Sequence, residues 1–168
     1  MGSLVALSAG ARYSDHVEAL ALIGATAPMG VHPEMIQSAS DNNHLVIDML
    51  TYWSYSKAAQ LGGNENPGIW MAGTTQRLLE RACENIIHAD LQACALYETG
   101  IEHASKIECP TLFILGERDI MTPIRSAKKM IESVAGAKVE VIAGSGHSLM
   151  MEKPDAILDA LITVIAQE

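Results

Sequence analysis

The chain has 168 residues, a length typical of a single domain. Apolar residues make up 49% of it, which is enough for a hydrophobic core and excludes an intrinsically disordered chain. Charged residues make up only 18%, and the formal net charge of -9 argues against a surface that binds nucleic acid.

The chain is predicted to open with a helix and then a strand. Residues 2–13 are apolar almost all round, which predicts a helix that is buried on more than one face. Residues 17–25 form a near-continuous apolar run closed by Gly24, the pattern of a strand covered on both faces of a parallel sheet. No uninterrupted apolar run reaches about 18 residues, so no membrane-spanning segment is expected.

Residues 32–106 carry mainly helix signals. Pro33 is expected to open a short helix, and Asp41 is expected to cap a second helix that runs to about Tyr55. The composition of 61–68, with its glycines, asparagines and proline, indicates a loop.

Two more helices are expected in the second half of this stretch. Apolar spacing favours a helix at about 74–88. Asp90 is the expected N-cap of a last short helix that runs through Tyr97.

The C-terminal third of the chain is predicted to contain two strands and two helices. Residues 111–116 form another near-continuous apolar run, the pattern of a strand covered on both faces. Residues 138–143 instead alternate, with Val139 and Val141 on one face, which favours a half-buried edge strand. Thr122 and Pro123 form a helix start in which threonine caps and proline takes the first helical position. A final helix is expected from Pro154, with an inner face made by Ile157, Leu158, Leu161, Ile162 and Ile165.

The predicted order is therefore helix, strand, helical insertion, strand, helix, strand, helix. Strands that alternate with helices imply an α/β fold with a parallel sheet, here of three strands.

Two loops that follow strands carry residue types suited to acid–base chemistry. Asp119 follows the strand at 111–116, and His147 follows the strand at 138–143. Parallel sheets place their sites at the carboxyl ends of the strands, so both side chains are expected at one edge. An aspartate that accepts one imidazole N–H leaves the other ring nitrogen free to take a proton from a nucleophile.

The run from Cys109 to Pro154, CPTLFILGERDIMTP and VEVIAGSGHSLMMEKP, resembles the end of the α/β-hydrolase fold. The resemblance implies that Asp119 and His147 are the acid and base of a Ser-His-Asp triad. It also implies a partial α/β-hydrolase fold with flanking helices: a core formed by 1–31 and 107–168, and a helical cap formed by 32–106.

The opening residues MGSLVAL resemble the end of a nucleophile elbow, G-x-S-x-G, and the helix behind it. Met1 then corresponds to the residue after the nucleophile and Gly2 to the last glycine. The resemblance implies that the nucleophile is not in this chain, which alone is expected to be inactive. Ser3 and Ser8 lie within the first helix, and Ser148 lies in the loop of the base, so none of them is expected to replace it.

No metal or cofactor site is predicted. Cys83 and Cys94 would lie about 16 Å apart along a continuous helix, and His88 would point away from Cys83, so a zinc site with His103 is rejected. The glycines do not form a phosphate-binding pattern. Six large side chains could line an apolar acyl pocket, although ordinary core packing is favoured for each: Met49, Trp53, Trp70, Met71, Met150 and Met151.

A strand at 17–25 with no neighbour on one side would be an exposed apolar edge that attracts another chain. Self-association is therefore expected, through this strand or through the first helix. Three cysteines, Cys83, Cys94 and Cys109, make a disulfide framework improbable and favour a reducing compartment. Since no membrane-spanning run is present either, a cytoplasmic protein without membrane contact is expected.

Two classes of function follow. The first is a fragment of a hydrolase whose parent cleaves a small apolar ester, lactone or related bond. The second is a non-catalytic self-associating binding or assembly module, with one half of a split enzyme as a variant.

Overall fold

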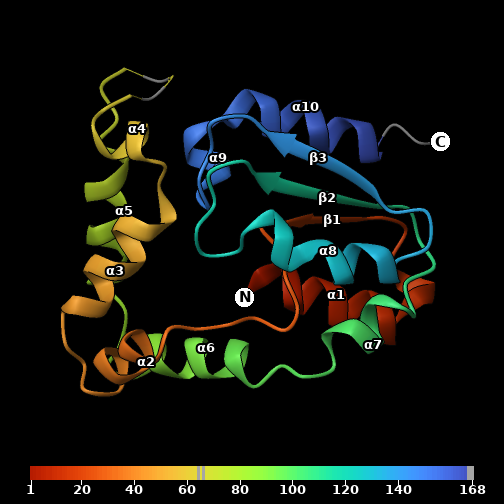
Figure 1. The fold of residues 1–168 in the computed structure, drawn as a ribbon, viewed down its shortest axis with the longest axis horizontal. Coiled ribbons are helices and arrows are strands. Elements are labelled where there is room, and N and C mark those ends of the chain that lie inside the picture. The colour runs from red at the N-terminus through yellow and green to blue at the C-terminus, as the bar shows by residue number, and fades with distance from the viewer. Residues whose placement is uncertain (64, 66, 166–168) are drawn as a thin grey trace.

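The computed structural model describes residues 1–63, 65 and 67–165, and Figure 1 shows their arrangement. A parallel sheet in the order β1-β2-β3 is formed by β1 (Leu20–Ile23), β2 (Thr111–Gly116) and β3 (Lys138–Ile142). Leu20 pairs with Thr111, and Leu112 pairs with Lys138. The predicted fold of three parallel strands with flanking helices is confirmed.

Helices cover both faces of the sheet because β2 is apolar on both sides (Figure 1). Phe113 and Leu115 pack with α1 (Gly2–Arg12) and α8 (Ile124–Ser133). Leu112 and Ile114 point to the other face, where they pack with α10 (Pro154–Ile165). Every residue of β2 is buried, so this strand is the centre of the core.

The buried stripe of α10 differs from the predicted one. Ile157, Ala160 and Val164 face the sheet, while Leu158, Ile162 and Ile165 are 57%, 50% and 78% exposed. Ile157 and Leu161 of the predicted face do pack against the sheet cluster.

Helix α1 is buried on one face, so the prediction of burial on several faces is wrong for the chain described. Leu4, Leu7 and Gly10 face the core, whereas Val5 is 61% exposed. A Cβ at Gly10 would lie 2.9 Å from Leu20 Cδ1, so glycine lets the helix approach β1 closely.

The two outer strands are less covered than the sequence indicated. β1 is shorter than 17–25, because a 3₁₀ turn η1 (Ser14–His16) precedes it and Gly24 ends it with a φ of +56°. β3 is an edge strand as predicted, but Val139 and Val141 are 44% and 45% exposed, so the expected half-burial is wrong.

Among the described residues between β1 and β2 there are six helices: α2 (Pro33–Ser40), α3 (Leu45–Ser54), α4 (Lys57–Gln60), α5 (Met71–Leu79), α6 (Ile86–Ala95) and α7 (Gly100–Ala104). In Figure 1, α2 to α6 lie to one side of the sheet, while α7 lies beside α1. None of the helices among the described residues is long and apolar enough to cross a membrane.

The helix boundaries near residue 41 and residue 80 differ from the predicted ones. Asp41 is the C-cap of α2, and α3 begins after His44. The helix predicted at 74–88 ends at Leu79, and Asp90 lies inside α6 instead of capping a helix. Asn85, the N-cap of α6, adopts a left-handed φ of 65°, so no single helix runs through residue 85.

Candidate active site

The loops after β2 and β3 lie side by side at the carboxyl edge of the sheet. Arg118 donates its backbone N–H to the Ser145 carbonyl at 2.8 Å, and the backbone N–H of Gly144 donates to the Glu117 carboxylate at 2.8 Å. A Cβ at Gly116 would lie 2.2 Å from the Gly146 carbonyl oxygen, so only glycine permits this approach.

The structure brings Asp119 and His147 together across these loops. His147 Nδ1 lies 2.8 Å from Asp119 Oδ2. The Asp119 side chain is 1% exposed and that of His147 is 30% exposed, so the acid is buried while the imidazole remains accessible. Because a carboxylate can only accept, Nδ1 carries the proton, and in the neutral imidazole Nε2 then presents a lone pair. Among the described residues, Nε2 has no hydrogen-bond partner.

Four donors hold the Asp119 carboxylate in place. The backbone N–H groups of Met121 and Thr122 each donate to Oδ1 at 2.8 Å. The Thr122 hydroxyl donates to Oδ2 at 2.6 Å, and the fourth donor is His147. Thr122 therefore orients the acid instead of capping α8 as predicted, and its hydroxyl oxygen also lies 3.0 Å from His147 Nδ1.

These contacts decide the charge of Asp119. Burial is the largest single influence and raises its pKa, but the hydrogen bond and charge of His147, with the hydrogen bonds from Thr122, lower the pKa below the ordinary 3.8. Asp119 is therefore ionised at neutral pH and stabilises a positive charge on the imidazole.

Gly24 completes the surroundings of the imidazole from β1. Its N–H donates to the Ile114 carbonyl at 2.9 Å, which places the end of β1 beside the loops after β2 and β3. A Cβ there would lie 3.0 Å from His147 Cε1. In the sequence Gly24 marks only the end of a strand, and a glycine directly after an apolar strand was the available signal of this role.

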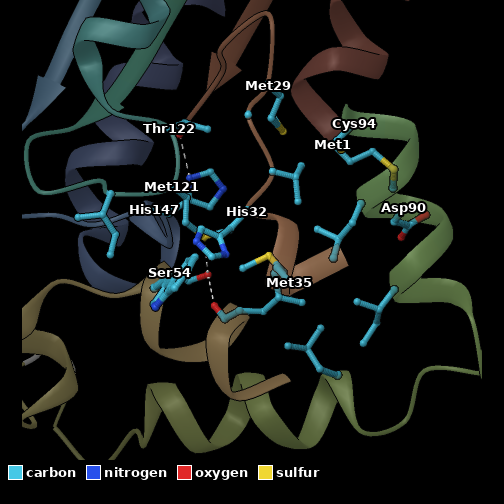
Figure 2. Close-up of a pocket in the computed structure, with 18 of the residues that line it drawn as sticks. Met1, Met29, His32, Met35, Ser54, Asp90, Cys94, Met121, Thr122 and His147 are labelled. Atoms are coloured by element: carbon cyan, nitrogen blue, oxygen red, sulfur yellow. Dashed lines mark hydrogen bonds between the residues drawn. The ribbon is translucent and has the colours of Figure 1, made fainter. Parts of the chain in front are cut away.

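A cavity of about 550 Å³ opens beside His147, between the sheet edge and the helices α2, α3, α5 and α6. Figure 2 shows Thr122 and His147 on one side of it and Met1 and Cys94 on the opposite side. Its lining is mainly apolar and includes Met29, Val31, Met35, Leu50, Trp53, Leu79, Ile87, Leu91, Ile120 and Met121.

Of the six side chains considered as pocket residues, Trp53 lines this cavity. Met49 and Met71 are instead buried in small clusters within the helical region. The other three, Trp70, Met150 and Met151, are exposed.

Two of the three serines considered as nucleophiles, Ser3 and Ser148, make other contacts. The Ser3 hydroxyl donates to the Ile23 carbonyl at 2.6 Å, inside the packing of α1 on β1. Ser148 precedes α9 (Leu149–Glu152), and its N–H donates to the Ser54 carbonyl. Ser54 itself lines the cavity, and its hydroxyl donates to the Leu50 carbonyl at 2.6 Å.

Within the described ranges, histidine, cysteine, aspartate and glutamate side chains form no group that could hold a metal ion. Cys83 is exposed, and Cys94 is buried at the wall of the cavity.

A family profile described as serine aminopeptidase, S33, matches residues 1–154 of the chain. Among curated proteins, monoacylglycerol lipase ABHD6 of Bos taurus is 31% identical over 65 residues, which are 39% of this chain and 19% of that protein. Monoacylglycerol lipase abhd6-A of Xenopus laevis is 36% identical over 53 residues, which are 32% and 16% of the two chains. The matched segments thus span less than a fifth of these relatives.

Solved structures match nearly the whole chain. The enol-lactonase from Burkholderia xenovorans LB400 superposes with a TM-score of 0.88 at 18% identity, over 99% of this chain and 63% of that one. A thermophilic esterase gives a TM-score of 0.78 at 24% identity, over 96% and 61% of the two chains. At such identities the likeness shows a shared fold, and this chain spans about three fifths of those proteins.

Proposed function

The chain belongs to the serine aminopeptidase S33 family, whose fold is that of the α/β hydrolases, and we propose that it supplies the base and acid of a Ser-His-Asp hydrolase. The observation that carries this proposal is the 2.8 Å hydrogen bond from His147 to the buried Asp119, beside an apolar cavity.

The two residues have distinct roles in the proposed reaction. As a serine oxygen bonds to the carbonyl carbon of the substrate, His147 Nε2 takes the serine proton. It then gives this proton to the leaving oxygen as the bond between that oxygen and the acyl carbon breaks. Asp119 holds Nδ1–H throughout and stabilises the imidazolium that forms between these two steps.

We propose that the serine belongs to polypeptide outside these 168 residues. Two observations support this. Met1 and His147 line the same cavity, and no hydroxyl among the described residues is hydrogen bonded to His147 Nε2. We further propose that 1–31 and 107–168 form the catalytic core and 32–106 the cap that covers the cavity.

The proposed substrate class is a small apolar ester or lactone. A cavity of about 550 Å³ with a mainly apolar lining accommodates a short acyl chain. The names of the similar proteins, a lactonase, an esterase and monoacylglycerol lipases, describe bonds of this type.

Activity assays separate the two parts of the proposal. The 168-residue chain alone is expected neither to hydrolyse 4-nitrophenyl butyrate nor to react with a fluorophosphonate probe. A longer polypeptide that adds a preceding Gly-x-Ser segment is expected to do both, and His147→Ala in it is expected to lose about 10³-fold or more in kcat. Labelling of the 168-residue chain would contradict the placement of the nucleophile, and an unaffected His147→Ala variant would contradict the role of the base.

A second proposal is self-association through the edge of β1 and the outer face of α1. In the described part of the chain β1 pairs only with β2, and Val5 and Tyr13 on or beside α1 are exposed next to a groove of about 360 Å³. The proposed occupant is a second copy of this chain. Sedimentation equilibrium at micromolar concentration is expected to show a dimer that Val5→Glu dissociates; a monomer under these conditions contradicts the proposal.

A further inference from the structure

Glu152 is a buried carboxylate that the proposed triad does not use. It ends α9 and is 4% exposed. Burial of a carboxylate is unfavourable unless its oxygens are paired. Among the described residues no lysine, arginine or histidine forms an ion pair with it, so its partners are backbone N–H groups alone.

These N–H groups belong to two segments that are far apart in sequence. Oε1 accepts from Gly146 at 2.9 Å and from Ser56 at 3.2 Å, and Oε2 lies 3.3 Å from the same Ser56 nitrogen. Gly146 immediately precedes His147. Ser56 follows α3, whose last turn brings Trp53 and Ser54 to the cavity wall.

The two segments are in tight contact at this point. A Cβ at Gly146 would lie 2.6 Å from the Ser56 nitrogen and 2.8 Å from Glu152 Oε1, so glycine is required. The N–H of Ser148 also donates to the Ser54 carbonyl at 2.8 Å. Backbone on both sides of His147 is thus hydrogen bonded to the cavity wall, directly or through one carboxylate.

We propose that Glu152 is a positioning residue, which fixes the His147 loop against residues 54–56 so that the imidazole and the cavity wall are placed by the same carboxylate. An apolar side chain at this position would leave two buried N–H groups unpaired. The inference rests on the proposed role of His147 as base, but its test reads hydrogen bonds, not hydrolysis.

The test is amide hydrogen exchange and imidazole NMR on the ¹⁵N-labelled 168-residue chain. In Glu152→Ala the exchange of the Gly146 and Ser56 amides is expected to accelerate about tenfold or more, and the His147 Nδ1 proton signal is expected to broaden. Glu152→Gln keeps an oxygen that can take the place of Oε1, so this variant is expected to keep slow exchange at the two amides and a sharp His147 Nδ1 proton signal. Lys153→Met, which removes only the surface ion pair with Glu65, is the matched control and is expected to change neither.

Two results overturn the proposal. One is exchange in Glu152→Ala that matches Lys153→Met at both amides. The other is equal acceleration of all amides, which marks a residue that only stabilises the fold. If Glu152→Ala does not fold, Glu152→Asp decides, because it keeps the charge but withdraws the carboxylate by one methylene; unchanged protection in that variant equally overturns the proposal. Failure of the triad assignment leaves these amide readouts unaffected.

Discussion

Gly24 faces the imidazole of His147 so closely that a methyl group on its Cα would lie 3.0 Å from Cε1 and 3.1 Å from Nδ1. The same residue has a φ of +56°, so its backbone conformation and its missing side chain are both needed. The end of β1 therefore takes part in placing a side chain that follows β3.

Gly24→Ala is expected to destabilise the fold by about 1–2 kcal/mol through its left-handed backbone and to displace the imidazole as well. Gly136→Ala is the matched control, since Gly136 has a φ of +69° and a Cβ added there would have nothing within 4 Å. Urea denaturation is expected to show similar losses of stability for both, while only Gly24→Ala alters the His147 signals. Identical His147 signals in the two variants would contradict the close contact.

Thr122→Val removes the hydroxyl that donates to Asp119 but keeps the shape of the side chain. We expect the free energy of unfolding to fall by about 1–3 kcal/mol, because a buried carboxylate loses one of its hydrogen-bond donors. The pKa of Asp119 is expected to rise toward 3.8, since the lost hydrogen bond favours the ionised form. ¹³C NMR titration of the carboxyl group measures this shift, and Thr122→Ser should leave the pKa of Asp119 near that of the wild type.

The stability of the fold is expected to fall in acid because of Asp119. Its pKa is lower in the folded chain than the ordinary 3.8, so the stabilisation is complete above that pH and is lost as pH falls through the folded value. Urea denaturation between about pH 2.5 and 5 should show this slope. Asp119→Asn should flatten the slope; an unchanged slope in that variant would assign acid sensitivity to other carboxyl groups.

His44 is expected to show the opposite pH dependence. Its hydrogen bonds to Glu80 and then to Asp48 raise its pKa above 6.5 and join the start of α3 to the end of α5. The contribution of these interactions to the stability of the fold is fully present below pH 6.5, and it is lost as pH rises through the pKa of His44 in the folded chain. NMR titration of the His44 ring protons should show the raised pKa, and Glu80→Gln should lower it; a pKa unaffected by this change would contradict the pairing.

Much of the fold was predictable because some segments have one strong signal. The bounds of β2 follow from an unbroken apolar run, and the pairing of Asp119 with His147 follows from the rule that parallel strands end at one edge. The break between α5 and α6 was not predictable, because it depends on Asn85, whose N–H donates to the Asn42 side chain from a distant segment.

The supporting residues of the site were missed for a similar reason. Thr122 has the sequence pattern of a helix cap, and Glu152 that of an ordinary charged residue in a surface helix. Their roles depend on what lies opposite them: a carboxylate for the first and two backbone N–H groups for the second. Such partners are set by the tertiary fold and leave no local pattern.

The hydrogen bond from Ser148 to the Ser54 carbonyl constrains how the helices over the cavity can move. It ties the end of α3 to the loop that carries His147, so the cavity wall at Ser54 and the imidazole cannot separate unless this bond breaks.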